Sequence, residues 1–161
     1  MNCTYTLDIH APIAKVFSLV YEEKNLKKWM DGLEETIFPE GYDRAKTVGT
    51  KFKQRIKEGS HVNEYDGEVI AYEKPHHLAI LLGNKHFTVK VDYRFTSDGT
   101  RTRLDYQAEM IRAGWFVRLM CKLFSGFTKR ILDKQMKKLK ELAESSDNTF
   151  QTSASVMATV K

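Results

Sequence analysis

Cysteines are scarce in this sequence, and so are the features of secreted or membrane-spanning proteins. Cys3 and Cys121 are the only cysteines among 161 residues. Two widely separated cysteines make a weak disulfide framework, so reduced thiols are the simpler interpretation. No uninterrupted apolar run approaches the ~20 residues that span a bilayer. The amino terminus lacks a basic region followed by an apolar one, so we expect no secretory signal and predict a cytoplasmic protein.

Motifs for metals, nucleotides and nucleophilic catalysis are also absent from the sequence. None of the five histidines has the spacing of a zinc site, and His76 and His77 are adjacent on a predicted strand, where they point to opposite faces. There is no P-loop, no G-x-G-x-x-G and no G-x-S-x-G. We therefore predict no metal and no cofactor. Without an obligatory catalytic set, the sequence favours a protein that is not an enzyme.

Positive charge is concentrated in one late segment. The whole chain has a net charge of +5. Nine basic residues stand against one acid, Asp133, in that segment: Arg112, Arg118, Lys122, Lys129, Arg130, Lys134, Lys137, Lys138 and Lys140. One interpretation is a solvated helix face. The other is a patch for anionic lipid headgroups, formed by Lys122, Lys129, Lys137 and Lys140. Nucleic acid is not expected, because exposed aromatics do not interleave with these basic residues.

Alternating apolar and polar residues predict a sheet of consecutive strands. In residues 50–57, Phe52, Gln54 and Ile56 share one face, and basic residues occupy the other. Period two with one charged face indicates a half-buried strand. Short turn sequences separate the segments and favour an antiparallel meander. The predicted strands are residues 4–9, 33–38, 50–57, 62–72, 76–82, 87–95 and 102–110.

Helical patterns occur near both ends of the chain. Apolar residues at helical spacing after Pro12 predict a short helix over 13–21, and a second begins at Asn25. A long amphipathic helix is predicted over 115–144, interrupted by Gly126. On a helical wheel its apolar side holds Phe116, Met120, Leu123, Phe124, Phe127, Ile131, Leu139 and Leu142. We predict one domain over 1–144 and a flexible tail over 145–161.

Three segments together resemble the START-like superfamily, also called SRPBCC, the birch-pollen-allergen or polyketide-cyclase/dehydrase superfamily. The first is Leu7–Phe17, an opening strand followed by Ala-Pro and a helix. The second is Asn25-Leu26-Lys27-Lys28-Trp29, and the third runs from Tyr65 to Ala79 with a break at Pro75. The resemblance implies an α+β helix-grip fold. A curved antiparallel sheet of about six to seven strands wraps around the long C-terminal helix, with two short helices after the first strand.

By this resemblance, we expect binding or transport of a small hydrophobic or amphiphilic ligand in a cavity between the sheet and the C-terminal helix. The candidate ligand-binding residues are Gln54, Tyr65, Phe87, Tyr93, Tyr106, Met110, Met120, Phe124, Phe127 and Ile131. The polar tips among them need partners, which other side chains, water or a ligand can supply. One alternative is a cyclase or dehydratase that uses cavity tyrosines and carboxylates. Another is a protein- or membrane-interaction module that uses the basic helix.

Overall fold

A computed structural model describes residues 2–41, 47–123 and 125–145 of the chain. The side chains of Met120, Cys121, Leu123 and Ser125 are also outside the description. Of the predicted tail, residues 145–161, only Ser145 is described.

The described residues form one seven-stranded antiparallel sheet, as the sequence pattern predicts. The order across the sheet is β1-β7-β6-β5-β4-β3-β2, so β1 crosses to the far edge and the others follow as a meander. The strands are β1 (Asn2–Ile9), β2 (Leu33–Ile37), β3 (Lys51–Glu58), β4 (His61–Glu73), β5 (His77–Gly83), β6 (Phe87–Ser97) and β7 (Thr102–Ala113).

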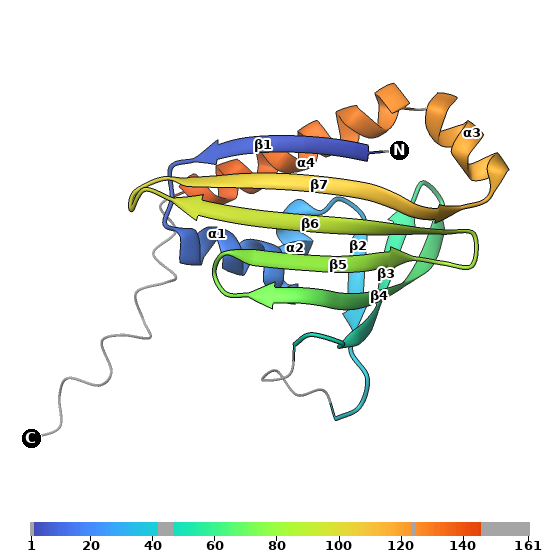
Figure 1. The fold of residues 1–161 in the computed structure, drawn as a ribbon, viewed down its shortest axis with the longest axis horizontal. Coiled ribbons are helices and arrows are strands. Elements are labelled where there is room, and N and C mark those ends of the chain that lie inside the picture. The colour runs from blue at the N-terminus through green and yellow to red at the C-terminus, as the bar shows by residue number, and fades with distance from the viewer. Residues whose placement is uncertain (1, 42–46, 124, 146–161) are drawn as a thin grey trace, which may run out of the picture.

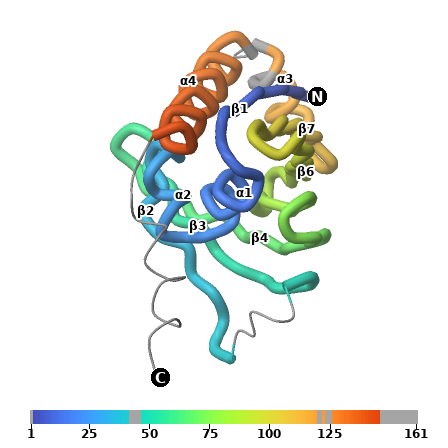
Figure 2. The backbone as a smooth tube through the Cα atoms, turned by 90° about the vertical axis from the view of Figure 1, so that its left-hand side faces the viewer, coloured from blue at the N-terminus to red at the C-terminus, as the bar shows by residue number. Residues whose placement is uncertain are grey.

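The described residues also form four helices. Two short ones follow β1, namely α1 (Ile13–Tyr21) and α2 (Glu23–Trp29). Two more follow β7, namely α3 (Trp115–Leu123) and α4 (Ser125–Glu144). The sheet curves, and α4 lies across its concave side (Figure 1, Figure 2). This is the α+β helix-grip architecture that the sequence predicts.

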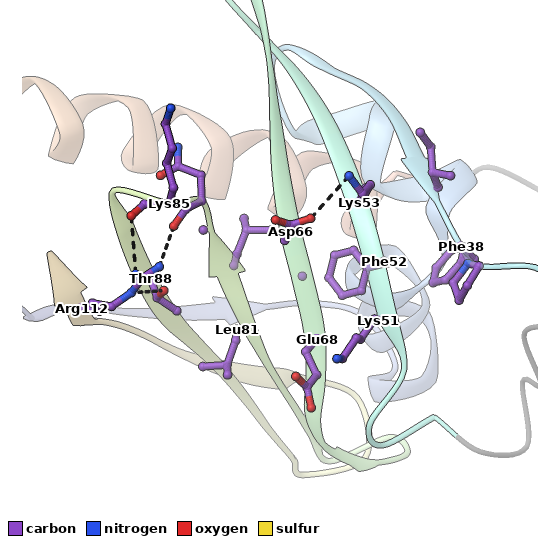
Figure 3. A pocket seen from close by; sticks show the side chains of 16 residues that line it. Phe38, Lys51, Phe52, Lys53, Asp66, Glu68, Leu81, Lys85, Thr88 and Arg112 are labelled. Atoms are coloured by element: carbon purple, nitrogen blue, oxygen red, sulfur yellow. Dashed lines mark hydrogen bonds and ion pairs between the residues drawn. The ribbon is translucent and has the colours of Figure 1, made fainter.

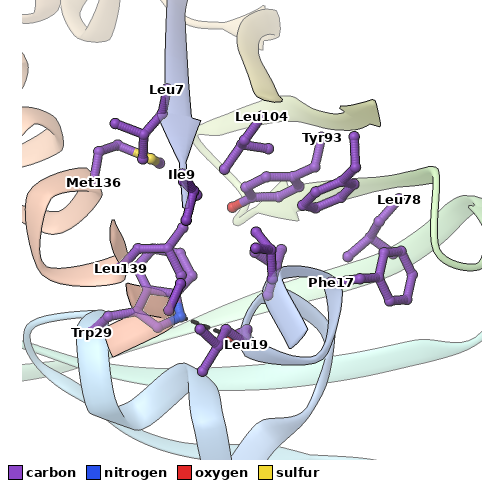
Figure 4. Close-up of a cluster of buried hydrophobic side chains, with 14 of the residues drawn as sticks. Leu7, Ile9, Phe17, Leu19, Trp29, Leu78, Tyr93, Leu104, Met136 and Leu139 are labelled. Atoms are coloured by element: carbon purple, nitrogen blue, oxygen red, sulfur yellow. Dashed lines mark hydrogen bonds between the residues drawn. The ribbon is translucent and has the colours of Figure 1, made fainter. Parts of the chain in front are cut away.

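The packed core lies where α1, α2 and the C-terminal half of α4 meet the sheet. Phe17 packs edge-on against Phe95, with ring centroids 5.4 Å apart. Trp29 is 1% exposed and its indole Nε1 donates a hydrogen bond to the carbonyl oxygen of Leu19 at 2.8 Å (Figure 4). Trp29 therefore fixes α2 against α1, because a buried indole N–H needs such a partner.

Polar contacts attach the same half of α4 to the opening segment. Glu144 accepts a hydrogen bond from the backbone N–H of His10 at 2.8 Å. Asp31, in the turn after α2, pairs with Lys134 at 2.8 Å and with Lys138 at 3.0 Å. Two of the nine basic residues of the late segment are thus paired with an acid on another element.

The prediction of one helix over 115–144 with a single apolar side is wrong in two respects. The structure has two helices, α3 and α4, with bounds on either side of residue 124. The buried face of α4 consists of Leu132, Met136, Leu139 and Ala143. Phe127 and Ile131, predicted to face inward, are 64% and 41% exposed. Both lie on α4 itself, and at about 100° per residue Ile131 is about 80° around the helix from Leu139, so they fall beside the buried face instead of on it.

Candidate functional site

A partly open cavity of about 170 Å³ lies between the concave face of the sheet and α4. Sheet, α1, α2 and α4 all contribute to its wall. Most of the lining is apolar, and no described residue that lines it carries an acidic or basic side chain. The lining residues are Val20, Tyr21, Leu26, Trp29, Met30, Thr36, Phe38, Phe52, Gln54, Val69, Leu78, Ile80, Leu82, Val91, Tyr93, Tyr106, Leu132, Gln135 and Met136.

Three of the predicted ligand-binding residues line this cavity: Gln54, Tyr93 and Tyr106. The other described candidates lie elsewhere. The rings of Tyr65 and Phe87 meet at a tilt with centroids 6.0 Å apart, and the Tyr65 hydroxyl donates a hydrogen bond to Glu58 at 3.0 Å.

The remaining predicted candidates are spread over the far end of the sheet and the two late helices. Met110 is half-buried near the end of β7 and is not among the lining residues. Phe127 and Ile131 are exposed on α4. Phe124 and the side chain of Met120 lie outside the described residues.

Two of the three tyrosines that line the cavity, Tyr93 and Tyr106, have raised pKa values. Tyr93 and Tyr106 are cross-strand partners on β6 and β7, and their rings meet edge-on at 5.3 Å. Burial raises the pKa of Tyr106 to about 12, and raises the pKa of Tyr93 further. Both therefore present hydroxyl groups, not phenolates, at neutral pH. Figure 4 shows the Tyr93 ring among the buried apolar side chains.

Sequence reasoning missed Thr36, which also lines the cavity. Simple alternation from an inward-facing Leu33 predicts that Thr36 points outward and Ile37 points inward. The pairing of β2 with β3 shifts register between Leu33 and Glu35, and such a bulge reverses the faces that follow. As a result Thr36 is 7% exposed and Ile37 is 38% exposed.

A second, more open space lies against strands β3 to β6. This groove has a volume of about 730 Å³ and a mixed lining (Figure 3). Lys51, Lys53, Asp66, Glu68, Lys85 and Arg112 contribute charge to it. Arg112 donates to the carbonyl oxygen of Asn84 at 2.8 Å and so holds the β5–β6 turn against β7.

The groove and the cavity share part of their walls. Phe38, Phe52 and Leu82 line both spaces. The Phe52 ring occupies the position beside Gly67 that a side chain there would need, so any Cβ at residue 67 would overlap the ring. We infer that Phe52 fits between groove and cavity because the residue opposite it on β4 is glycine.

The described part of the chain contains no cluster of three or more potential metal ligands of the His, Cys, Asp or Glu type. Among the same residues, no helix is both long and apolar enough to cross a membrane.

Comparison with known families agrees with this architecture. The family model described as polyketide cyclase / dehydrase and lipid transport matches residues 2–144. The chain belongs to this family. The resemblance to the START-like superfamily is thereby confirmed. No curated protein sequence matches the chain.

Solved structures of low sequence identity share the fold. A protein from Thermus thermophilus is 17% identical, with a TM-score of 0.68 over 91% of this chain and 100% of that one. A conserved protein from Geobacillus kaustophilus is 18% identical, with a TM-score of 0.65 over 89% and 95%. The Zhui aromatase/cyclase from Streptomyces sp. R1128 is 12% identical, with a TM-score of 0.69 over 89% and 93%. At these identities the likeness shows that this chain shares their fold, and its function needs separate evidence.

Proposed function

We propose that this protein binds a small, neutral, mainly apolar molecule in the cavity between its sheet and α4. The observation that carries the proposal is the cavity of about 170 Å³ with a mainly apolar, uncharged lining. An apolar cavity of about 150 Å³ is large enough to take up benzene. A charged ligand would lose its hydration without meeting a counter-ion.

The cavity size also limits the ligand. Pockets for drug-sized molecules range from about 300 to 1,000 Å³, and this one is smaller. The proposed ligand is therefore about the size of a single ring.

The lining favours binding over acid–base catalysis. A cyclase or dehydratase needs a group that takes or gives a proton near neutral pH. The described lining residues include tyrosines but no carboxylate and no imidazole. Because burial raises the pKa of Tyr106 and of Tyr93, these hydroxyls stay protonated at neutral pH and are poor bases.

A matched pair of variants tests the proposal. Val91 lines the cavity and is 8% exposed, and Val62 is 43% exposed on β4. We expect Val91→Phe to fill the cavity and abolish toluene binding, while Val62→Phe leaves it unchanged. Calorimetry measures binding, and circular dichroism checks that both variants fold. If the wild-type protein binds no toluene, or Val91→Phe binds it equally well, the cavity is not the site.

A second candidate function is docking on an anionic membrane, favoured by an exposed apolar surface on α3 and α4. We call this surface the α3–α4 apolar surface; it consists of Trp115, Phe116, Leu119, Phe127 and Ile131. Their exposed fractions are 78%, 57%, 45%, 64% and 41%. Exposed aromatic side chains on amphipathic helices insert at the level of the lipid headgroups.

The charge around the α3–α4 apolar surface fits the same partner. Arg118, Lys122, Lys129 and Arg130 are exposed on these helices, and no acidic residue occurs between residues 112 and 132. Each basic residue near an anionic bilayer contributes about 1 kcal/mol of attraction. Of the other two predicted lipid contacts, Lys137 is exposed, and Lys140 lies 3.8 Å from Glu144.

Vesicle co-sedimentation tests this second function. We expect binding to vesicles of phosphatidylcholine with phosphatidylserine, weakening with salt, and none to phosphatidylcholine alone. Changing Trp115 and Phe127 to serine should remove binding, whereas Val62→Ser, at an exposed apolar residue of the sheet, should not. Equal binding by both variants would exclude the α3–α4 apolar surface as the docking site.

A further inference from the structure

Two buried oxygen atoms on the cavity wall have no hydrogen-bond partner among the described residues. They are Gln54 Oε1 and Thr36 Oγ1. Gln54 is 4% exposed and Thr36 is 7% exposed. Buried polar atoms in native proteins almost always have a partner, and an unpaired one is destabilising. Both residues line the cavity, so a hydrogen-bonding group held there would supply the missing partner.

These two oxygens belong to one place on the wall. Thr36 of β2 and Gln54 of β3 are directly opposed in the strand pairing. Opposed residues on one face of an antiparallel pair have Cβ atoms about 4.5–5.5 Å apart. Phe52 of β3 and Phe38, which directly follows β2, also line the cavity, and their ring centroids are 6.0 Å apart. The polar pair is thus a small hydrophilic spot beside aromatic rings.

The chemistry of the pair restricts what can satisfy it. Gln54 Oε1 accepts hydrogen bonds, so its partner must donate one. The Thr36 hydroxyl can donate or accept. A single hydroxyl group that donates to Gln54 and accepts from Thr36 completes both residues at once. A carbonyl or ether oxygen cannot donate, so it would leave Gln54 Oε1 unpaired.

We propose that Thr36 and Gln54 bind the hydroxyl group of a neutral ligand whose apolar body, about one ring in size, fills the cavity. This inference rests on the proposed binding function and names the ligand's polar group. The neutral hydroxyls of Tyr93 and Tyr106 line the same cavity, where they can contact a second polar atom of the ligand. A phenol or a cyclic alcohol has the required form.

Two probes of matched shape test the inference, because p-cresol and p-xylene differ by a hydroxyl in place of a methyl group. Calorimetry gives the ratio of their dissociation constants for each protein. In a purely apolar cavity p-xylene has the advantage, since its entry breaks no hydrogen bond with water. We expect Gln54→Met to lower the affinity for p-cresol relative to that for p-xylene by roughly ten-fold compared with wild type. Thr36→Val should shift it in the same direction by less.

Control variants separate the pair from general effects of the substitutions. The controls are Lys51→Met and Thr96→Val. Lys51 is on the same strand as Gln54 but is exposed, and Thr96 is exposed on β6. Both should keep the wild-type ratio. Because Gln54→Met and Thr36→Val remove unpaired buried oxygens, we expect the ligand-free variants to have melting temperatures no lower than that of wild type.

A comparison of probes in the wild-type protein needs no variant. 4-Methylanisole, which cannot donate a hydrogen bond, should bind roughly ten-fold more weakly than p-cresol.

The outcomes separate the hydroxyl inference from the binding function. If both probes bind but the ratio is the same in wild type and Gln54→Met, the cavity is a binding site and the hydroxyl inference is wrong. In that case a bound water satisfies the pair. If neither probe binds to wild type, the proposed binding function fails together with the inference.

Discussion

The two ends of α4 have opposite surroundings. Toward its C-terminus, Leu132, Met136, Leu139 and Ala143 are buried against α1, α2 and β1. Toward its N-terminus, Phe127 and Ile131 are exposed, and so are the aromatic residues of α3.

Polar contacts follow the same division. Glu144 bonds to the backbone of His10, and Asp31 holds Lys134 and Lys138. Among the described residues, no ion pair involves Arg118, Lys122, Lys129 or Arg130. The comparison indicates that one half of the helix stabilises the fold, while the other half and α3 present a surface.

Alanine substitutions at the two ends should differ most in their effect on stability. Leu139 is 0% exposed, whereas Ile131 is 41% exposed. We expect Leu139→Ala to lower the free energy of unfolding by about 2–5 kcal/mol, through lost burial and a new cavity. Ile131→Ala should change it by about 0.5 kcal/mol or less. Urea denaturation measures both, and similar losses would mean that the N-terminal half is covered in solution.

Removal of the Asp31 contacts should have a smaller effect that depends on pH and salt. Hydrogen bonds from Lys134 and then Lys138 hold the pKa of Asp31 below its usual value of 3.8. A carboxylate with a lowered pKa stabilises the fold above about pH 4, and this stabilisation is lost as pH falls through the folded-state pKa. The side chain is 36% exposed, so we expect Asp31→Asn to cost at most about 1 kcal/mol.

Matched lysine variants check this assignment in thermal melts at neutral and acidic pH. Lys134→Gln should destabilise the protein slightly at neutral pH, and the difference should vanish in acid and at high salt. Lys137→Gln, at the exposed neighbour on α4, should have no such pH dependence. A constant loss across pH for Asp31→Asn would show that packing, and not charge, explains the contact.

Most of the fold could be predicted because alternation and turn sequences are local signals. Period two places Phe52, Gln54, Val69 and Val91 on the inner face, and all four are buried. The buried face of the late helix could not be predicted in this way. Met136 is buried and Ile131 is exposed on the same helix, because contacts with distant elements decide which face of α4 is covered.

The candidate site was only partly accessible to the same reasoning. Gln54, Tyr93 and Tyr106 stand out in the sequence as polar tips on an apolar face, and they line the cavity. Thr36 does not, because a bulge in β2 reverses its side, and nothing in the local sequence marks that bulge. Gln135 joins the lining only through the phase of α4, which the sequence does not reveal.

Gly67 links the volume of the cavity to the volume of the groove. Because Phe52 borders both and lies where a side chain of residue 67 would stand, a larger residue there must displace the ring. The ring adjoins the cavity on one side and the groove on the other, so volume gained by one is taken from the other. Ligand size could thus be retuned from β4 without altering Thr36 or Gln54, and selectivity for size and for polar group would be separately adjustable.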